Sequence, residues 1–274
     1  MKRMNRRTKV VVFTVFMALF LIAVYVFGMM IPEEAMEGNF LNAKKPPSFT
    51  HLFGTDALGR DLFLRTVKGL TVSMTIGFAA SLLSAVVAVF VGIAAAVGSK
   101  WVDALVNWVI DLIMGIPHTI LVILISFAMG RGLKGLLIGI AATHWCSLAR
   151  LIRGEVLQLR AQQYVAASRK LGKSGAWILI HHLLPHLVPQ FFVGLVLLFP
   201  HAILHEASVS FLGFGLSPEQ AAIGIILSES MRYISTGMWW SAVLPGLTLV
   251  LLVLFVDKLG DYLRMITDPY SAQE

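Results

Sequence analysis

One short segment of the chain resembles the end of a phosphate-binding motif. Gly172-Lys173-Ser174 has the order that closes a P-loop, whose backbone amides cradle nucleotide phosphates. A complete P-loop has a further glycine five residues before Gly172, and Ala167 occupies that position. A P-loop also follows a buried strand, whereas the residues before Ala167 are charged and helical in pattern. The sequence therefore argues against a nucleotide site in this segment.

The second set of chemically capable residues is a pair of histidines next to an acid. His201 and His205 are spaced to share one face of a helix, where two imidazoles can meet one metal ion. The residues after Glu206 do not complete a His-Glu-x-x-His motif, which excludes a zinc protease of that type. Two interpretations remain: the pair, with Glu206, faces a translocation path that passes a metal chelate, or it makes local hydrogen bonds within a helix bundle.

The elements that position these residues are predicted to cross a membrane. Of the 274 residues, 57% are hydrophobic and only 14% are charged, against roughly 25% charged in a soluble domain. The net charge of +7 is typical of basic cytoplasmic loops facing anionic lipid, and we do not expect a nucleic-acid partner. The single cysteine, Cys146, has no partner for an internal disulfide.

Six apolar runs predict an all-α polytopic membrane protein with six transmembrane helices. The third run contains Asp111 and Pro117, which either line a path or cap and kink the helix. If the N-terminus is placed inside the cell, the inside segments contain more Lys and Arg than the outside segments. This bias predicts that both termini and residues 150–185 are cytoplasmic. The runs cover residues 10–31, about 69–98, 105–129, 135–149, about 187–205 and 238–256.

A stripe of small residues follows one face of the second run at intervals of four. Such a stripe lets another helix approach closely, either within the chain or in a partner subunit. Its members are Ala80, Ser84, Ala88, Gly92 and Ala96.

The cytoplasmic segment is predicted to form two short helices joined by a turn. Arg169 lies in the last turn of the first helix, where a cation suits the helix dipole, and Gly172 is placed to end that helix. Ser174 can cap a second helix, which we expect Pro185 to end. Such a shape suits docking of a soluble partner, although a solvated loop is the alternative. The predicted apolar face of the first helix consists of Tyr164, Ala167, Ser168 and Leu171.

This segment resembles the signature loop of binding-protein-dependent ABC importer permeases. The matching residues are Ala166-Ala167-Ser168, then Gly172, then the Leu184-Pro185 ending. Ala166 stands where the family often has Glu, and Ser168 where it has Ala, so the resemblance implies one candidate charged contact to the ATPase fewer than in members that carry the Glu. The resemblance implies ATPase docking by Tyr164, Ala166, Ala167, Ser168, Arg169, Leu171, Gly172, Leu184 and Pro185.

Two further stretches resemble the second permease of the peptide/nickel branch of these importers. They are "FGTDALGRDLFLR", residues 53–65, and "EASVSFLGFG", residues 206–215, together with the C-terminal run. The resemblance implies a type I ABC importer permease fold with both termini inside, in a prokaryotic cell membrane. It divides the chain into an N-terminal helix and outer loop, 1–68, and a permease domain, 69–274, with coupling helices at about 150–185.

The same resemblance implies the partners and the cargo. A homologous permease would form a heterodimer with this chain, two cytoplasmic ATPases would use ATP and Mg²⁺, and a solute-binding protein would deliver the cargo. The chain itself would bind no cofactor and catalyse no reaction. The pair His201 and His205, with His144-Trp145, resembles nickel-type members, which favours nickel or another chelated metal, with short peptides as the alternative.

The outer loop carries a compact motif of glycines and charges. We expect Thr55 or Asp56 to cap a helix, and Asp56, Arg60 and Asp61 to pair on one short helix, either to fix the loop or to seat a partner. The full motif is Gly54, Thr55, Asp56, Gly59, Arg60 and Asp61.

Two other classes of protein fit less well. An ATP-independent secondary transporter predicts internal repeats and buried charges in several spans, and the sequence has no clear repeat. A membrane enzyme predicts a nucleophile with its base, and no such set is recognisable.

Overall fold

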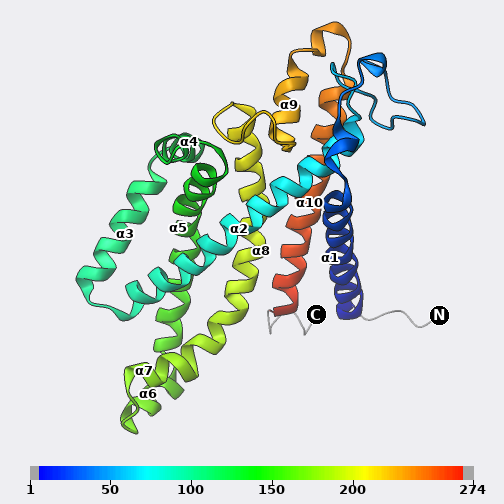
Figure 1. Ribbon diagram of the computed structural model, residues 1–274. Coiled ribbons are helices and arrows are strands. Elements are labelled where there is room, and N and C mark those ends of the chain that lie inside the picture. Colours follow the sequence, from blue (N-terminus) through cyan, green and yellow to red (C-terminus); the bar gives the residue numbers. More distant parts are fainter. Residues whose placement is uncertain (1–5, 268–274) are drawn as a thin grey trace, which may run out of the picture.

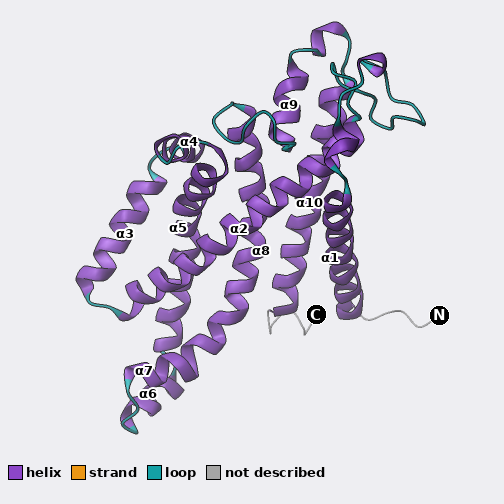
Figure 2. Cartoon of the chain, in the orientation of Figure 1, coloured by secondary structure: helices purple, strands orange, loops and turns teal. Residues whose placement is uncertain are grey.

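The computed structural model describes residues 6–267, and most of them are helical (Figures 1 and 2). This confirms the predicted all-α class. The long helices are α1 (Arg6–Met30), α2 (Leu62–Val97), α3 (Lys100–Met114), α4 (His118–Ala128), α5 (Gly132–Arg160), α8 (Leu184–Phe211) and α10 (Trp240–Thr267). The short elements are η1 (Glu33–Met36), η2 (Phe40–Asn42), α6 (Gln163–Lys170), α7 (Gly175–Ile178), η3 (Leu179–Leu183), α9 (Ile223–Met231) and η4 (Ile234–Thr236).

Within the described residues, five helices are long and apolar enough to cross a membrane, or six if α3 and α4 count as one span. The two helices of that pair meet at an angle of 97°. The sequence predicted one span over residues 105–129, so the bend is a correction to its shape. Pro117 disfavours helical backbone at Ile116 and cannot donate an amide hydrogen bond, which breaks the helix at this point.

The predicted fourth span ended at residue 149, and this end is wrong. Helix α5 continues to Arg160, because its later charges have partners. Nε and Nη2 of Arg153 donate to the two carboxylate oxygens of Asp103 on α3, at 2.5 and 2.6 Å. Arg160 donates to the carbonyl oxygen of Ala96 on α2. The charges end the apolar run of the sequence, but they do not end the helix.

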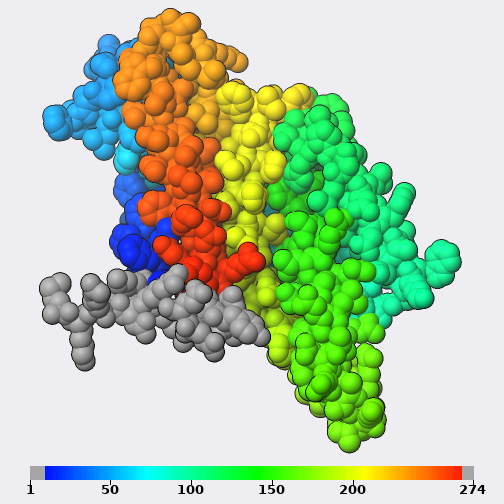
Figure 3. Space-filling view, turned by 180° about the vertical axis from the view of Figure 1, so that it is seen from behind, coloured from blue at the N-terminus to red at the C-terminus, as the bar shows by residue number. Residues whose placement is uncertain are grey.

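The chain has two distinct ends. Figure 1 shows the start of α1, the end of α10 and the α6–α7 segment at one end, and the connection between α1 and α2 with α9 at the other. The distribution of Lys and Arg assigned these same segments to opposite sides of the membrane. We call them the cytoplasmic end and the outer end. The space-filling view shows the α6–α7 segment, in yellow-green, projecting at the cytoplasmic end (Figure 3).

The small-residue stripe of α2 packs inside this chain. All five of its residues are buried, and α2 contacts α5 extensively. A Cβ atom at Gly92 would lie 2.7 Å from the carbonyl oxygen of Ala149 on α5. Ser84 Oγ lies 3.3 Å from the carbonyl oxygen of Ala141, also on α5. Of the two interpretations of the stripe, packing within the chain is therefore the one observed.

Candidate functional site

The cytoplasmic turn forms as the sequence predicts. Gly172 has a φ of +80°, a conformation that glycine adopts without steric cost. The amide of Gly172 donates to the carbonyl of Arg169, and that of Lys173 donates to the carbonyl of Ser168, at 3.0 and 3.1 Å. These two bonds form a Schellman motif that ends α6. Ser174 Oγ then accepts from the amide of Trp177 at 3.2 Å and caps α7.

Pro185 does not end the second helix, contrary to expectation. The chain passes from α7 through the π-helical turn η3 directly into α8, and Pro185 lies in the first turn of α8. The π-helical turn allows this continuity because the amide of Leu184 donates to the carbonyl of Leu179. Pro185 has no amide to donate, and the widened π-helical turn before it lets the helix continue past it.

Helix α6 packs against the protein through Val165 and leaves most of the predicted face uncovered. Val165 is fully buried, whereas Tyr164 and Leu171 are 41% and 79% exposed. Two large apolar side chains are thus left uncovered on the projecting segment. We call the exposed residues of the predicted docking set the docking surface: Tyr164, Ala166, Ala167, Arg169, Leu171, Gly172 and Pro185. The other two predicted members, Ser168 and Leu184, are half-buried.

Ring contacts hold α6 against the helix that leads into α8. Ser168 Oγ lies 2.9 Å from His182 Nε2, and the ring of Tyr164 contacts His182 with centroids 5.3 Å apart. The ring of Tyr164 also stacks on that of His186 in the first turn of α8, with centroids 6.4 Å apart. The docking surface is therefore fixed to the base of α8.

A second site lies where α4, α5 and α8 meet. The ring of His118 lies 4.5 Å from those of both His144 and His205, and the last two are 5.1 Å apart. One potential ligand atom from each residue lies within 4.8 Å of the others. We call this site the histidine pocket; it has a volume of about 250 Å³ and is lined by Met114, His118, Thr143, His144, Cys146, Ser147, Leu198, His201 and His205.

The structure separates the residues that the sequence grouped as path candidates. His205 belongs to the three-histidine group, whereas His201 lines the pocket outside that group. The side chain of Glu206 is fully buried and accepts a hydrogen bond from Ser210 Oγ at 2.8 Å. Asp111 forms an exposed ion pair with Arg150 at 2.7 Å. Neither acid lines the pocket.

His118 was missed by the sequence interpretation. It is the first residue of α4, and it reaches α5 and α8 because the chain bends sharply just before it. The sequence shows the proline that causes the bend, but it does not show the direction in which the chain bends.

Polar side chains around the histidine pocket are exposed on otherwise apolar helices. Asp111, Ser147, Arg150 and His201 all lie at the surface of this chain. Ionisable groups are costly in lipid and usually face a bundle interior or a water-filled cavity. This face of α3, α5 and α8 is therefore unsuited to contact with lipid.

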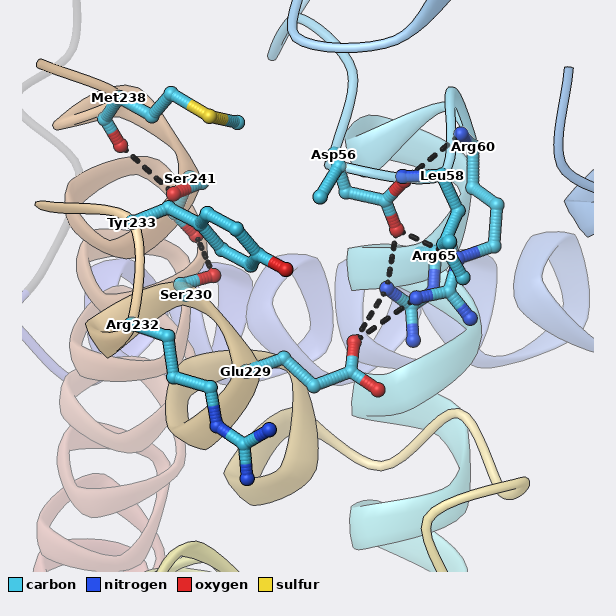
Figure 4. A pocket seen from close by; sticks show the side chains of 11 residues that line it. Asp56, Leu58, Arg60, Arg65, Glu229, Ser230, Arg232, Tyr233, Met238 and Ser241 are labelled. Carbon is cyan, nitrogen blue, oxygen red and sulfur yellow. Dashed lines mark hydrogen bonds and ion pairs between the residues drawn. The ribbon is translucent and has the colours of Figure 1, made fainter. Parts of the chain in front are cut away.

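The outer end holds a network of buried and half-buried charges (Figure 4). The carboxylate of Asp56 accepts from Arg60 Nε and Arg65 Nη1 at 2.6 and 2.8 Å. The same two arginines donate to Glu229 of α9 at 3.0 and 2.9 Å. Arg65 and Glu229 had no local signal in the sequence, because they are far apart along the chain and meet only in the fold.

The outer motif is a turn rather than a short helix. Gly54 and Gly59 have φ values of +73° and +76°, as expected for tight turns. Neither Thr55 nor Asp56 caps a helix. Thr55 Oγ1 instead donates to the carbonyl of Asn42 at 2.5 Å.

Asp61 is the residue that caps α2. Its carboxylate accepts from the amides of Phe63 and Leu64 at 2.9 and 3.1 Å. It also contacts His51 Nδ1 at 2.8 Å. The sequence had suggested a pair between Asp61 and Arg60. This pair does not form, because the carboxylate oxygens of Asp61 bind the amides at the start of α2 and the ring of His51.

Comparison with solved structures supports the fold. A chain of the MetNI methionine ABC transporter, from a crystal of its inward-facing conformation, superimposes with a TM-score of 0.62. The match covers 76% of this chain and 98% of that chain, at 19% sequence identity. The predicted ABC importer permease fold is thereby confirmed.

Comparison with known sequences gives the family. Residues 88–264 match the family described as binding-protein-dependent transport system inner membrane component. The dipeptide transport system permease protein DppC of Bacillus subtilis is 32% identical over 268 residues, which cover 97% of this chain and 84% of that protein. The oligopeptide transport system permease protein OppC of the same organism is 35% identical over 231 residues, or 84% and 75% of the two chains. The chain therefore belongs to the binding-protein-dependent transport system inner membrane components, as a multi-pass membrane permease with the ABC importer fold.

Proposed function

We propose that this chain is one of two homologous permeases that together form the translocation path of an ATP-driven importer. Two cytoplasmic ATPases hydrolyse ATP with Mg²⁺, a solute-binding protein delivers the cargo at the outer end, and this chain binds no cofactor and performs no covalent chemistry. The observation that carries the proposal is the docking surface, which leaves Tyr164 and Leu171 uncovered on a projecting basic segment. Large apolar side chains in such a position favour a protein partner.

The connections of the docking surface explain how ATPase movement would reach the path. Helix α6 follows α5 after Ala161 and Gln162, and it is held to His182 through Ser168. The segment that carries His182 is continuous with α8. A displacement of α6 is thus transmitted to α5 and α8, the helices that carry His144 and His205. ATP-driven closure of the ATPases would bias the chain between inward-open and outward-open states.

The homologous permease is proposed to cover the face with Asp111, Ser147, Arg150 and His201. These polar side chains are exposed in the single chain, and a water-filled path between two permeases would hydrate them. The histidine pocket would then open towards the path rather than towards lipid.

Two kinds of cargo are supported by different observations. Short peptides are favoured by the relatives, which are named as dipeptide and oligopeptide transport system permeases. Nickel or another chelated metal is favoured by the histidine pocket, since imidazole is a common ligand of such ions. We keep chelated metal as the leading candidate and short peptides as the alternative.

The docking proposal is tested by co-purification of the ATPases. We expect Gly172→Arg, or deletion of residues 169–175, to abolish ATPase association while the chain still inserts into the membrane. Gly130→Arg is the matched control, because Gly130 also has a positive φ of +99° and open space around it but lies near the outer end of α5. Undiminished ATPase association in the Gly172 variants would defeat the proposal.

The cargo is tested by replacing both His201 and His205 with Ala and measuring uptake of labelled nickel and of a labelled dipeptide. A metal path predicts that nickel uptake falls and dipeptide uptake does not. Equal effects on both, or no effect, would favour the peptide alternative.

A further inference from the structure

We infer that His118, His144 and His205 bind one divalent transition-metal ion directly. The three residues come from α4, α5 and α8, and their rings lie within 5.1 Å of one another. The convergence depends on the 97° bend before α4, which brings the first residue of that helix to the other two. This inference rests on the proposed function for its biological use, since it names the ion that the path would handle.

His144 supplies the strongest single observation. Its side chain is 6% exposed, and its Nδ1 lies 2.9 Å from the carbonyl oxygen of Ile140. A carbonyl oxygen only accepts, so Nδ1 carries the proton and Nε2 is left with the lone pair. This Nε2 makes no hydrogen bond within the described part of the chain. Histidines that bind metals show this arrangement, with the second ring nitrogen donating to a backbone carbonyl.

His118 is also oriented by its surroundings. Its Nε2 lies 3.2 Å from Thr143 Oγ1 and 3.2 Å from His144 Nδ1. Its ring and that of His205 are half-buried and border the pocket, so an ion can reach them. One ring nitrogen of each of the three histidines lies within 4.8 Å of one ring nitrogen of each of the others, whereas imidazole nitrogens on a tetrahedral ion are roughly 3.4 Å apart. Rotation of the half-buried rings would close that difference.

The lining of the pocket selects the class of ion. Imidazole suits zinc, copper and nickel, and Met114 and Cys146 add sulfur atoms nearby. Calcium and magnesium require oxygen ligands, chiefly carboxylates, and none of the described residues that line the pocket is an Asp or Glu. The site therefore favours a first-row divalent transition metal over the alkaline-earth ions.

Direct binding to the purified full chain tests the site. The chain, in lipid nanodiscs and purified through a tag without histidine, is equilibrated with Ni²⁺, and bound metal is measured by mass spectrometry. We expect one Ni²⁺ per chain, no displacement by excess Mg²⁺, and a loss of affinity of at least about 10-fold in His118→Ala, His144→Ala and His205→Ala. His181→Ala, on the cytoplasmic segment, should stay within about 3-fold of the unmodified chain, because it is not among the residues that line the pocket.

A replacement ligand guards against loss of binding through misfolding. His205→Cys retains a metal-binding side chain, so it should bind Ni²⁺ more tightly than His205→Ala. The inference is overturned if the unmodified chain binds no Ni²⁺, if His181→Ala weakens binding as much as His144→Ala, or if His205→Cys is folded and binds no better than His205→Ala. A chain that imports with ATP but binds no Ni²⁺ would remove this site and leave the proposed function intact. A chain that binds Ni²⁺ but never associates with ATPases would leave this site intact and remove the proposed function.

Discussion

Two single residues set helix ends at opposite ends of the molecule. Asp61 starts α2 at the outer end by accepting two backbone amides, and Gly172 ends α6 at the cytoplasmic end with a left-handed backbone. The carboxylate of Asp61 can accept hydrogen bonds from free backbone amides, and Gly172 adopts a positive φ without a steric clash because it has no side chain. The consequences of changing each residue can be predicted separately.

Replacing Asp61 with Ala should destabilise the start of α2. The loss of both cap bonds costs about 1 kcal/mol, and the contact with His51 is lost as well. We expect a lower melting temperature of the purified chain in detergent. Asp61→Asn keeps a capping oxygen and should melt close to the unmodified chain; equal melting of all three would contradict the assigned cap.

Replacing Gly172 with Val should disturb the turn between α6 and α7. A β-branched residue is strained at a positive φ, at a cost of about 1–2 kcal/mol, while Asn tolerates this conformation better. We expect weaker ATPase association in Gly172→Val than in Gly172→Asn, measured by co-purification. Identical behaviour of the two variants would show that the left-handed turn does not matter for docking.

At the scale of elements, α2 and α5 form the centre of the fold through small residues. The Ala, Ser and Gly stripe of α2 lets α5 approach until Gly92 has no room for a side chain. The approach also brings α5, with His144, next to α4 and α8. The stripe therefore positions the histidine pocket as well as the core.

Gly92→Leu should force α2 and α5 apart. A Cβ at this position would lie 2.7 Å from a backbone oxygen and 3.0 Å from Ile152, and overpacking costs roughly 1–3 kcal/mol or more. We expect a loss of folded protein in size-exclusion chromatography. Gly154→Leu in α5 is the control, since no described atom beyond its own stretch of helix lies within 4 Å of a Cβ there, and it should be recovered normally.

The elements also show how far the sequence could be read. Apolar runs located the spans because a helix that crosses the hydrocarbon core needs about 20 apolar residues. The serine cap and the glycine turn of the cytoplasmic segment were predictable because each depends only on neighbouring residues in the chain. The end of α5 was missed because Arg153 and Arg160 find partners on α3 and α2, which no local pattern reveals. The same holds for His118, whose place depends on the direction of a bend, and for Arg65 with Glu229, which meet only after folding.

At the scale of the whole molecule, the two ends have different tasks. The outer end is held by the ion pairs of Asp56, Arg60, Arg65 and Glu229, and the cytoplasmic end presents the docking surface. Between them, α5 and α8 pass the histidine pocket on a face that is too polar for lipid. This arrangement suits a permease that receives cargo at one end and a mechanical input at the other.

The outer network should matter for the rigidity of the molecule. Glu229→Ala would leave Asp56 as the one remaining acid that pairs with Arg60 and Arg65. Removing one partner of a fully buried ion pair lowers the free energy of unfolding by several kcal/mol. Because Glu229 is 34% exposed, we expect a smaller loss of about 1 kcal/mol. A fall in melting temperature that is larger than that of Glu219→Ala would support the network; equal melting would contradict it.

Under the proposed function, this chain moves cargo only when cytoplasmic ATPases act on it. The most direct measurement is uptake into proteoliposomes that contain the chain, a homologous permease and the ATPases, with binding protein and labelled cargo added at the outer side. The proposed function predicts uptake that requires ATP, stops when the ATPases are omitted, and is lost when residues 169–175 are deleted. Uptake that continues without the ATPases, driven by an ion gradient alone, would contradict it.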